Sequence, residues 1–369
     1  MFRPVKIGSL ELPGNLFLAP VAGYTDRAFR SICAEEGACF SFTELISAEA
    51  LFRNFGRYGL VDPDSISQRH IDRGAEEDGN KKSNGSESRK ASKAVLAAVN
   101  LLLRGENEKL YAIQLFGAQS ESIYKAAVLL APLKPDALDI NCGCPVPKVV
   151  KNGAGSAMMK NPSNLGRAVE AAARASRESL GGIPVTIKLR SGWDSGSINY
   201  AECARIAVEA GAAMVSLHPR TRAQNYGGKS DWTYIADLAA RLPVPVTGSG
   251  DLYTPQDARQ MLNETGCAAV MFARGAMGNP FIFSAARSFL ETGAWEPAPA
   301  SARIAAVMRH LETLAAYTGE RTACLEMRKQ FCAYTKGFVG GAALREKAVH
   351  AQTIEEYRRI IEKWHENNV

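Results

Sequence analysis

The chain has 369 residues, of which 46% are hydrophobic, and a formal net charge of +6. This length suffices for one large domain and a smaller one, and the sequence has no uncharged apolar run of about 18 residues, so no membrane span is expected. Residues 1–6 lack the apolar core of a signal peptide, and the eight cysteines are scattered along the chain, which favours a reducing cytoplasm over a secreted disulfide framework. The mildly basic charge alone is weak support for a polyanionic partner.

Short apolar runs typical of buried strands recur along the chain, with helical periodicity between them. They span residues 16–23, 38–45, 110–117, 138–141, 184–190, 213–218, 244–248 and 267–273. Apolar strands that alternate with helices indicate parallel pairing with both faces of the sheet covered. Eight such units predict an α/β fold, a (β/α)8 TIM barrel. An open doubly wound sheet is the alternative, but the Gly-x-Gly-x-x-Gly turn that it should carry is missing.

Three further segments set the expected domain organisation. A helix should begin near Thr25, with Thr25 as its N-cap. Residues 62–93 are charged and rich in Ser, Gly and Asn, which predicts a flexible insertion. After a Pro-rich linker at 296–300, only helical periodicity remains, over 302–317, 324–334 and 354–364. We therefore expect a barrel domain over residues 1–300 and a small all-helical domain over 301–369.

Residues 137–145 begin as a strand and end in a turn that carries two thiols. Cys142 and Cys144 would share one face if both lay on the strand, and Pro145 should end that strand. No second cysteine pair or histidine pair stands at a spacing typical of zinc sites, so we expect no structural metal.

Polar or glycine-rich residues lie at the end of almost every predicted strand. Turns account for the glycines, but not for Gln114, Lys188 and His218 inside apolar runs, where an unpaired polar group costs a few kcal/mol. In a TIM barrel the carboxyl ends of the strands converge on the face that holds the active site. We therefore expect these three side chains at the barrel mouth.

The last two loops, residues 248–251 and 274–278, are rich in glycine and include Arg274. Loops after strands 7 and 8 of such barrels often bind phosphate through backbone N–H groups, so a phosphorylated cofactor or substrate is predicted. Lys188 in the mouth could form a Schiff base or hold an electron-rich ring by its charge. With Cys144 present, a Schiff-base lyase and a redox enzyme with a thiol acid both remain open.

Several segments resemble the tRNA-dihydrouridine synthases, in particular the bacterial branch of that flavin-dependent family. The most specific are Gly23-Tyr-Thr-Asp-Arg27 and Asn141-Cys-Gly-Cys-Pro-Val-Pro-Lys-Val149. The other matching segments are residues 19–22, 154–157, 185–193, 218–222, 250–251, 274–276 and 279–281. The resemblance runs over residues 6–290 apart from the insertion, and more weakly into the helical tail.

The resemblance implies a tRNA-dihydrouridine synthase with flavin mononucleotide (FMN) in the barrel mouth, reduced by NADPH or NADH, that acts on uridines of tRNA. It further implies a cytoplasmic enzyme without a membrane or an obligate protein partner. The residues matching the family's cofactor site are Pro20, Val21, Ala22, Gln114, Lys188, His218, Ser249, Gly250, Asp251, Ala273 and Arg274. Cys144 matches the general acid that protonates C5 of uracil while C6 accepts hydride. Asn141, Lys148 and Arg190 are expected to contact the substrate.

The chain departs from the family pattern in the insertion and at two loop positions, Ser249 where Asn is usual and Ala273 where Gly is usual. In the helical tail, cations alternate with aromatic residues, which suggests contact with tRNA phosphates and stacking on bases. These residues are Arg321, Arg328, Lys329, Lys336, Arg345 and Lys347, with Phe331, Tyr334 and Phe338. The alternatives are a flavin-containing barrel that reduces a small enone or dihydroorotate, and an RNA-binding relative without turnover.

Overall fold

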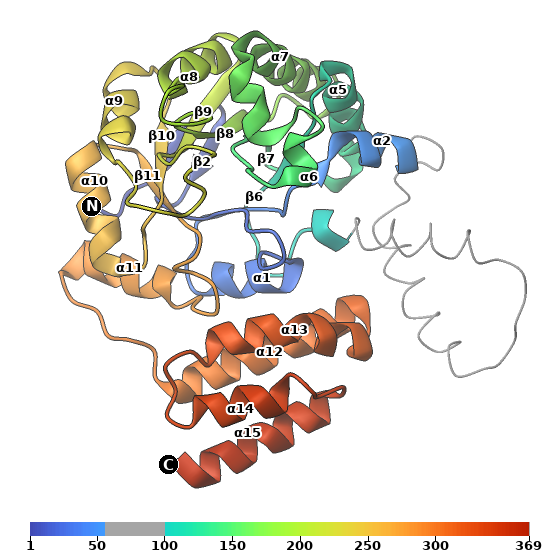
Figure 1. The fold of residues 1–369 in the computed structure, drawn as a ribbon, viewed down its shortest axis with the longest axis vertical. Helices are drawn as coiled ribbons and strands as arrows, with labels where there is room; N and C mark the ends of the chain where they lie inside the picture. Colours follow the sequence, from blue (N-terminus) through green and yellow to red (C-terminus); the bar gives the residue numbers. More distant parts are fainter. Residues whose placement is uncertain (56–99, 369) are drawn as a thin grey trace, which may run out of the picture.

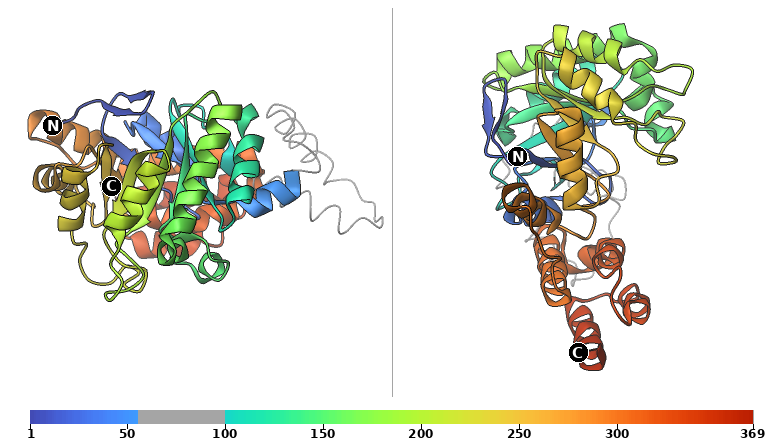
Figure 2. Two further views of the ribbon diagram at one scale, coloured as in Figure 1. Left: turned by 90° about the horizontal axis from the view of Figure 1, so that it is seen from above. Right: turned by 90° about the vertical axis from the view of Figure 1, so that its left-hand side faces the viewer.

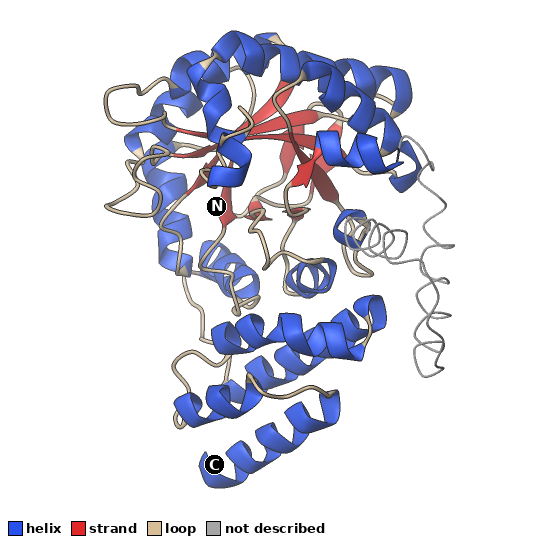
Figure 3. Cartoon of the chain, turned by 45° about the vertical axis from the view of Figure 1, so that its right-hand side comes forward, coloured by secondary structure: helices blue, strands red, loops and turns tan. Residues whose placement is uncertain are grey.

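In the computed structural model, which describes residues 1–55 and 100–368, eight parallel strands close into a barrel wrapped by helices (Figure 3). The strands are β3 (Leu16–Leu18), β4 (Phe40–Phe42), β6 (Tyr111–Phe116), β7 (Ala137–Cys142), β8 (Val185–Arg190), β9 (Ala212–His218), β10 (Val246–Ser249) and β11 (Ala269–Phe272). Neighbours in the chain pair in order, β11 pairs with β3, and β4 pairs with β6, which closes the ring. The predicted (β/α)8 barrel is confirmed, and each strand overlaps a segment that the sequence indicated, with β7, β9 and β10 extending one residue beyond it at one or both ends.

Helices cover the outside of the barrel because their apolar faces pack on the outward residues of the strands. They are α1 (Arg27–Glu35), α2 (Ala48–Phe55), α5 (Ser120–Leu129), α7 (Pro162–Ser179), α8 (Tyr200–Glu209), α9 (Thr233–Arg241), α10 (Pro255–Thr265) and α11 (Ile282–Thr292). Local sequence fixes their ends. Asn161 caps α7, and Thr254 and Asp257 form a capping box at the start of α10. None of the described helices has the length and apolar character needed to cross a membrane.

A hairpin that the sequence analysis missed covers the amino-terminal end of the barrel. It consists of β1 (Val5–Ile7) and β2 (Leu10–Leu12). A separate short strand, β5 (Ile46–Ser47), pairs with the carboxyl end of β6. Val5, Ile7 and Leu12 join the apolar cluster that fills this end of the barrel. The opposite half of the interior is polar, with Gln114, Asp139 and Thr186 at one level of the sheet. Polarity therefore rises toward the carboxyl ends of the strands.

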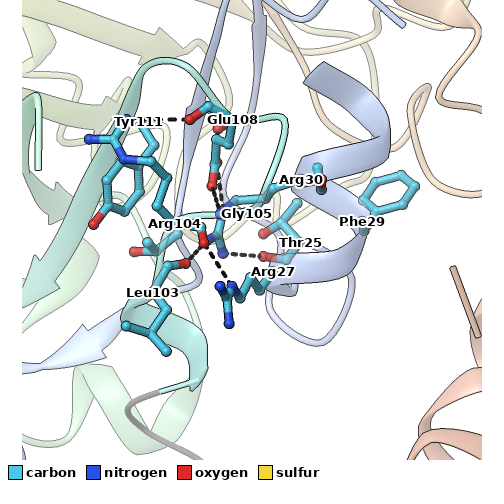
Figure 4. A network of polar contacts seen from close by, with 12 residues as sticks. Thr25, Arg27, Phe29, Arg30, Leu103, Arg104, Gly105, Glu108 and Tyr111 are labelled. Atoms are coloured by element: carbon cyan, nitrogen blue, oxygen red, sulfur yellow. Dashed lines mark hydrogen bonds and ion pairs between the residues drawn. The ribbon is translucent and has the colours of Figure 1, made fainter. Parts of the chain in front are cut away.

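Helix α1 is tied to the barrel by a buried ion pair (Figure 4). Arg30 Nε donates to Glu108 Oε1 at 2.8 Å, and both side chains are almost completely buried. The remaining Arg30 donors bind the backbone carbonyls of Leu103 and Thr25 at 2.6 and 3.2 Å. The prediction that Thr25 caps this helix is wrong. Asp26 is the N-cap and accepts from the Phe29 N–H at 2.9 Å, while the Thr25 hydroxyl is engaged with the backbone of Val21.

The carboxyl-terminal region contains four helices, which Figures 1 and 2 show stacked to one side of the barrel. They are α12 (Ala300–Thr318), α13 (Glu320–Tyr334), α14 (Gly341–Ala348) and α15 (Ile354–Asn368). The helical nature of this region is confirmed, and α14 was not foreseen. The division at residue 300 stays a prediction, and the predicted insertion at 62–93 lies outside the described residues.

The helical region meets the barrel at Asp26. His310 of α12 places Nε2 3.3 Å from both carboxylate oxygens of Asp26. Gln330 of α13 donates to Asp26 Oδ2 at 3.3 Å and to the carbonyl of Tyr24 at 3.0 Å. His310 also stacks on Phe29, with ring centroids 5.6 Å apart. These contacts place α13 next to the loop that follows Pro20–Ala22.

Candidate functional site

A cavity of about 320 Å³ opens at the carboxyl ends of the strands, within the size range of small-molecule sites. Thirteen of the residues predicted from the sequence line it: Pro20, Val21, Ala22, Asn141, Cys144, Lys188, Arg190, His218, Ser249, Gly250, Asp251, Ala273 and Arg274. Because parallel strands end at the same face of a barrel, residues more than 250 positions apart in the chain meet here.

Gln114 and Lys148 are not among the lining residues. Gln114 is fully buried one level below Lys188, because it pairs with Asp139 in the sheet whereas Lys188 pairs with Asn141. Its amide reaches the cavity wall only through Asn141. Lys148 is exposed on the short helix α6 (Pro147–Val150). The structure therefore does not bring the Lys148 side chain together with the other predicted substrate contacts.

The Cys144 thiol reaches the cavity because the chain turns at the end of β7. Asn141 Oδ1 accepts from the backbone N–H groups of Cys144 at 2.9 Å and Gly143 at 3.2 Å, which folds the turn back on the strand. The Cys144 carbonyl accepts from both the N–H and the hydroxyl of Ser156 at 3.0 Å. Gly155 has φ +60°, and a Cβ there would lie 2.8 Å from the Cys144 carbonyl oxygen, so only glycine fits.

The two cysteines of this stretch have different environments, because only Cys142 lies on the strand and the condition for a shared face is therefore not met. The strand ends at Cys142, whose side chain is fully buried toward the helices, with Sγ 3.9 Å from Met158 Sδ. Cys144 lies beyond the strand and lines the cavity. Burial raises the pKa of the Cys144 thiol, and the charges of Arg190 and Lys188 lower it by less. At neutral pH the thiol therefore keeps its proton and can serve as an acid.

Lys188 and Arg190 both project from β8, but they differ in the number of hydrogen bonds that they make. Arg190 donates through Nε to the carbonyl of Gly143 at 2.8 Å and through Nη1 to those of Thr221 and Asn225 at 2.8 and 2.9 Å. It thus ties the Cys144 turn to the loop after β9. Lys188 makes no hydrogen bond or ion pair with any residue in 1–55 or 100–368. Burial, reinforced by the charge of Arg190, lowers its pKa to about 8.

His218 is neutral because burial and the nearby cations, Lys188 first among them, lower its pKa well below the ordinary value. Its Nε2 lies 3.3 Å from Arg220 Nη1. Since a guanidinium can only donate, Nε2 is the acceptor and the proton resides on Nδ1. The ring therefore has one defined tautomer.

At the other end of the cavity, Asp251 orders two arginines. Asp251 Oδ2 accepts from Arg220 at 2.8 Å and from the Ser230 N–H at 2.8 Å, and Oδ1 accepts from Arg274 at 3.2 Å. Burial raises the pKa of Asp251, but these bonds and charges outweigh it and the pKa is lowered. Ser249 donates its hydroxyl to the carbonyl of Met271 at 3.1 Å. This end is rich in positive charge and suits a phosphate.

Sequence reasoning missed four residues of the site. Arg220 stood in a matching segment but was not assigned a role, although its buried guanidinium bridges His218 and Asp251. Tyr226 and Tyr253 flank the Arg274 guanidinium, with ring centroids 4.9 and 5.3 Å from it. Asp139 was part of the strand pattern, and only the pairing of β6, β7 and β8 shows that it contacts Gln114. The two tyrosines are exposed and lie in loops, so they carry no periodic signal that could have identified them.

The chain as a whole is similar to known proteins. The family model "Dihydrouridine synthase (Dus)" matches residues 91–367. A protein of Treponema pallidum described as a probable tRNA-dihydrouridine synthase is 41% identical over 366 residues, covering 98% of this chain and 96% of its own. The tRNA-dihydrouridine synthase B of Xanthomonas campestris is 31% identical over 352 residues, with 95% and 92% covered.

Among solved structures, a 2-naphthoyl-CoA reductase superposes with a TM-score of 0.52 at 13% sequence identity, covering 78% of this chain and 52% of that one. At this identity the likeness concerns the fold alone.

Proposed function

The chain belongs to the dihydrouridine synthase family, and from this premise we propose that it reduces the C5–C6 double bond of uridines in tRNA, using FMN that NADPH or NADH reduces. The observation that carries the proposal is the placement of the protonated Cys144 thiol, the Lys188 ammonium and the Asp251–Arg274 pair around one cavity. We infer a cytoplasmic protein, because all eight cysteines are free.

The residues present fit FMN. Lys188 is a half-buried cation on the cavity wall that makes no hydrogen bond or ion pair within the described residues, so its ammonium can donate to the electron-rich edge of a flavin ring. Pro20, Val21 and Ala22 offer a largely apolar wall for the flat face of that ring. At the other end, only glycine fits at position 250, since a Cβ there would lie 2.4 Å from Ser230 Oγ, and the cavity wall there is bare backbone. Arg274 would bind the phosphate.

Cys144 and Lys188 have different roles in the proposed reaction. When bound, FMN supplies hydride to C6 of the uracil ring, and C5 then needs a proton. Cys144 holds that proton on Sγ at neutral pH, and the bonds from Asn141 and Ser156 keep the thiol facing the cavity. The positive charge of Lys188 would stabilise negative charge that develops on the ring systems. The thiolate left on Cys144 is reprotonated from solvent.

The reaction is tested by following bound flavin through one turnover. The purified protein should show the visible absorbance of a flavin, which NADPH bleaches without oxygen and tRNA lacking dihydrouridine restores. Fully modified tRNA is the control and should leave the flavin reduced. Reoxidation by a small enone but not by tRNA would instead indicate a small-molecule reductase. Tight tRNA binding by a protein without flavin would indicate an RNA-binding relative.

A uridine must leave the folded tRNA to enter a barrel mouth, so we propose that the target base is extruded and that the helical region binds the surrounding backbone. The stacking part of the earlier expectation is wrong for Phe331 and Tyr334, which are buried in the helical core. Phe338 is half-buried and stacks on Trp364. Exposed cations remain available for phosphates. Lys329 lies beside Tyr24, 5.7 Å from its ring centroid, close to the cavity loop.

Binding of tRNA should weaken with salt, each phosphate contact adding about −0.7 to −0.9 to the slope of log K against log salt concentration. Lys329→Gln should make that slope less negative by about one contact. The control is Lys6→Gln at the opposite end of the barrel, where Lys6 is 69% exposed. A flat slope in the unmodified protein, or equal effects of both substitutions, contradicts phosphate binding by the helical region.

A further inference from the structure

A chain of buried hydrogen bonds runs across three strands beneath the cavity. Thr186 of β8 donates its hydroxyl to Asp139 Oδ1 at 2.5 Å, and Gln114 of β6 donates Nε2 to Asp139 Oδ2 at 2.6 Å. Asn141 donates Nδ2 to Gln114 Oε1 at 2.8 Å. Thr186, Asp139 and Gln114 are fully buried and Asn141 is 6% exposed. No water competes at the first three of these positions.

This series of hydrogen bonds ends at the backbone of Cys144, the residue that carries the catalytic thiol. Asn141 Oδ1 accepts from the N–H groups of Gly143 and Cys144. Each of the two amides therefore uses its nitrogen toward Asp139 and its oxygen toward Cys144. Both amides point the same way along the chain, so the orientation of one determines that of the other.

Asp139 is the member that fixes this direction. An ionised carboxylate only accepts hydrogen bonds, so the neighbouring Gln114 must present its nitrogen to Asp139 and its oxygen to Asn141. Asn141 must then present its nitrogen to Gln114, which leaves its oxygen for the N–H groups of the turn. A neutral group at position 139 can donate as well as accept. Both amides could then rotate, and the Asn141 nitrogen would face the N–H of Cys144, where no hydrogen bond can form.

We propose that Asp139 is a positioning residue of the reaction, which through Gln114 and Asn141 sets the polarity of the hydrogen bonds that aim the Cys144 thiol into the cavity. The proposal rests on the proposed function, because it assigns Asp139 to the proton-donating half of that reaction. Asp139 is not among the residues that line the cavity, so it would act through Gln114 and Asn141 and without contact with the substrate.

The ionisation of Asp139 gives the proposal a pH dependence. Burial raises the pKa of Asp139 to about 6, while the bonds from Thr186 and Gln114 and the charge of Lys188 lower it by less. Within the described residues, Lys188 is the charged group that faces it from β8, and β6 presents the uncharged Gln114. The carboxylate that orients the chain is present at neutral pH and is lost as the pH falls through about 6.

The raised pKa of Asp139 also distinguishes a positioning role in the reaction from a role in stabilising the fold. Because the pKa of Asp139 is higher in the folded protein than its ordinary value, ionised Asp139 disfavours folding at neutral pH. Asp139→Asn removes that charge, which offsets the hydrogen bonds that the turn would lose if the amides rotate, so the unfolding temperature should stay close to that of the unsubstituted protein. A residue retained only for stability would lower the unfolding temperature when it is replaced.

The test compares Asp139→Asn with the unsubstituted holoenzyme. The amount of bound flavin and its rate of reduction by NADPH should stay within about twofold. Reoxidation by tRNA should slow by about 10²-fold, because a misaimed Cys144 thiol is no longer aligned with C5 of the uracil ring. In the unsubstituted enzyme the rate of reoxidation should fall below about pH 6, and this fall should be absent from the variant. Loss of flavin, or an unchanged rate of reoxidation, would overturn the proposal.

Two matched substitutions and a second readout complete the experiment. Thr186→Val removes one donor to Asp139 and should move the acidic limb to higher pH. Thr247→Val removes another fully buried strand hydroxyl, which contacts Met214 instead, and should leave the limb in place. Alkylation of Cys144 by iodoacetamide, located by mass spectrometry, needs no tRNA and should accelerate several-fold in Asp139→Asn. Unchanged alkylation overturns the proposal. Altered alkylation in a protein inactive on tRNA would support the positioning and reject the proposed function.

Discussion

Cys144→Ala is expected to yield a yellow protein that NADPH still reduces but that tRNA reoxidises about 10²–10⁴-fold more slowly, the usual contribution of a general acid. The flavin should remain because Lys188, His218 and the Asp251–Arg274 pair are untouched. The proton for C5 must then come from water, which is not held in position. Stopped-flow absorbance measures the two half-reactions separately.

Cys142→Ala is the matched control, because it removes a thiol two residues away that packs against Met158 outside the cavity. It should leave both half-reactions unchanged. The pH profile gives a second check. Burial raises the pKa of Cys144, so the acid form is present at neutral pH and reoxidation should fall only as the pH rises through that raised pKa. Equal rates for Cys144→Ala and the unsubstituted enzyme would assign the proton to another group.

Glu108→Gln is expected to lower the free energy of unfolding by about 3–5 kcal/mol, the range found when one partner of a buried ion pair is removed. Arg30 is fully buried and Glu108 nearly so. The arginine would keep its bonds to Thr25 and Leu103 but would lose its counter-charge in a site that water does not reach. Denaturation by urea, followed by circular dichroism, measures the change.

Glu209→Gln provides the comparison, because it breaks the pair with Arg205 on α8, whose side chains are 59% and 60% exposed. The expected loss is below about 1 kcal/mol, since water screens and replaces such pairs. If both substitutions cost the same, the Arg30–Glu108 pair does not carry the stability assigned to it.

The barrel could be predicted because its strands are continuous apolar runs, a pattern that burial on both faces imposes. The β1–β2 hairpin was not predicted, because each of its strands has only three residues and the middle residue of each is charged. Thr25 and Asp26 are both good N-caps, and only the three-dimensional path of the chain decides between them.

The site was predictable to the extent that the resemblance supplied roles for residues that the barrel brings together. The resemblance could not supply the level at which each side chain lies along the barrel axis. Gln114 and Lys188 look alike in the sequence, as polar residues within apolar strands, but the strand register places them at different levels of the barrel. Likewise Cys142 and Cys144 differ only because the strand ends between them. The role of Arg220 could not be predicted, because it depends on a hydrogen bond to Asp251, which lies 31 residues away in the sequence.

The contact of Asp26 with His310 and Gln330 has a consequence for exchanging parts between related enzymes. The Phe29 ring packs on both His310 and Tyr334, with centroids 5.6 and 6.4 Å apart. The surface of α1 is thus complementary to one particular pair of helices. A chimera that takes its helical region from a relative must also take the matching face of α1. Otherwise a carboxylate and an aromatic ring fitted to the original helices meet a foreign surface, a few residues from the cavity loop.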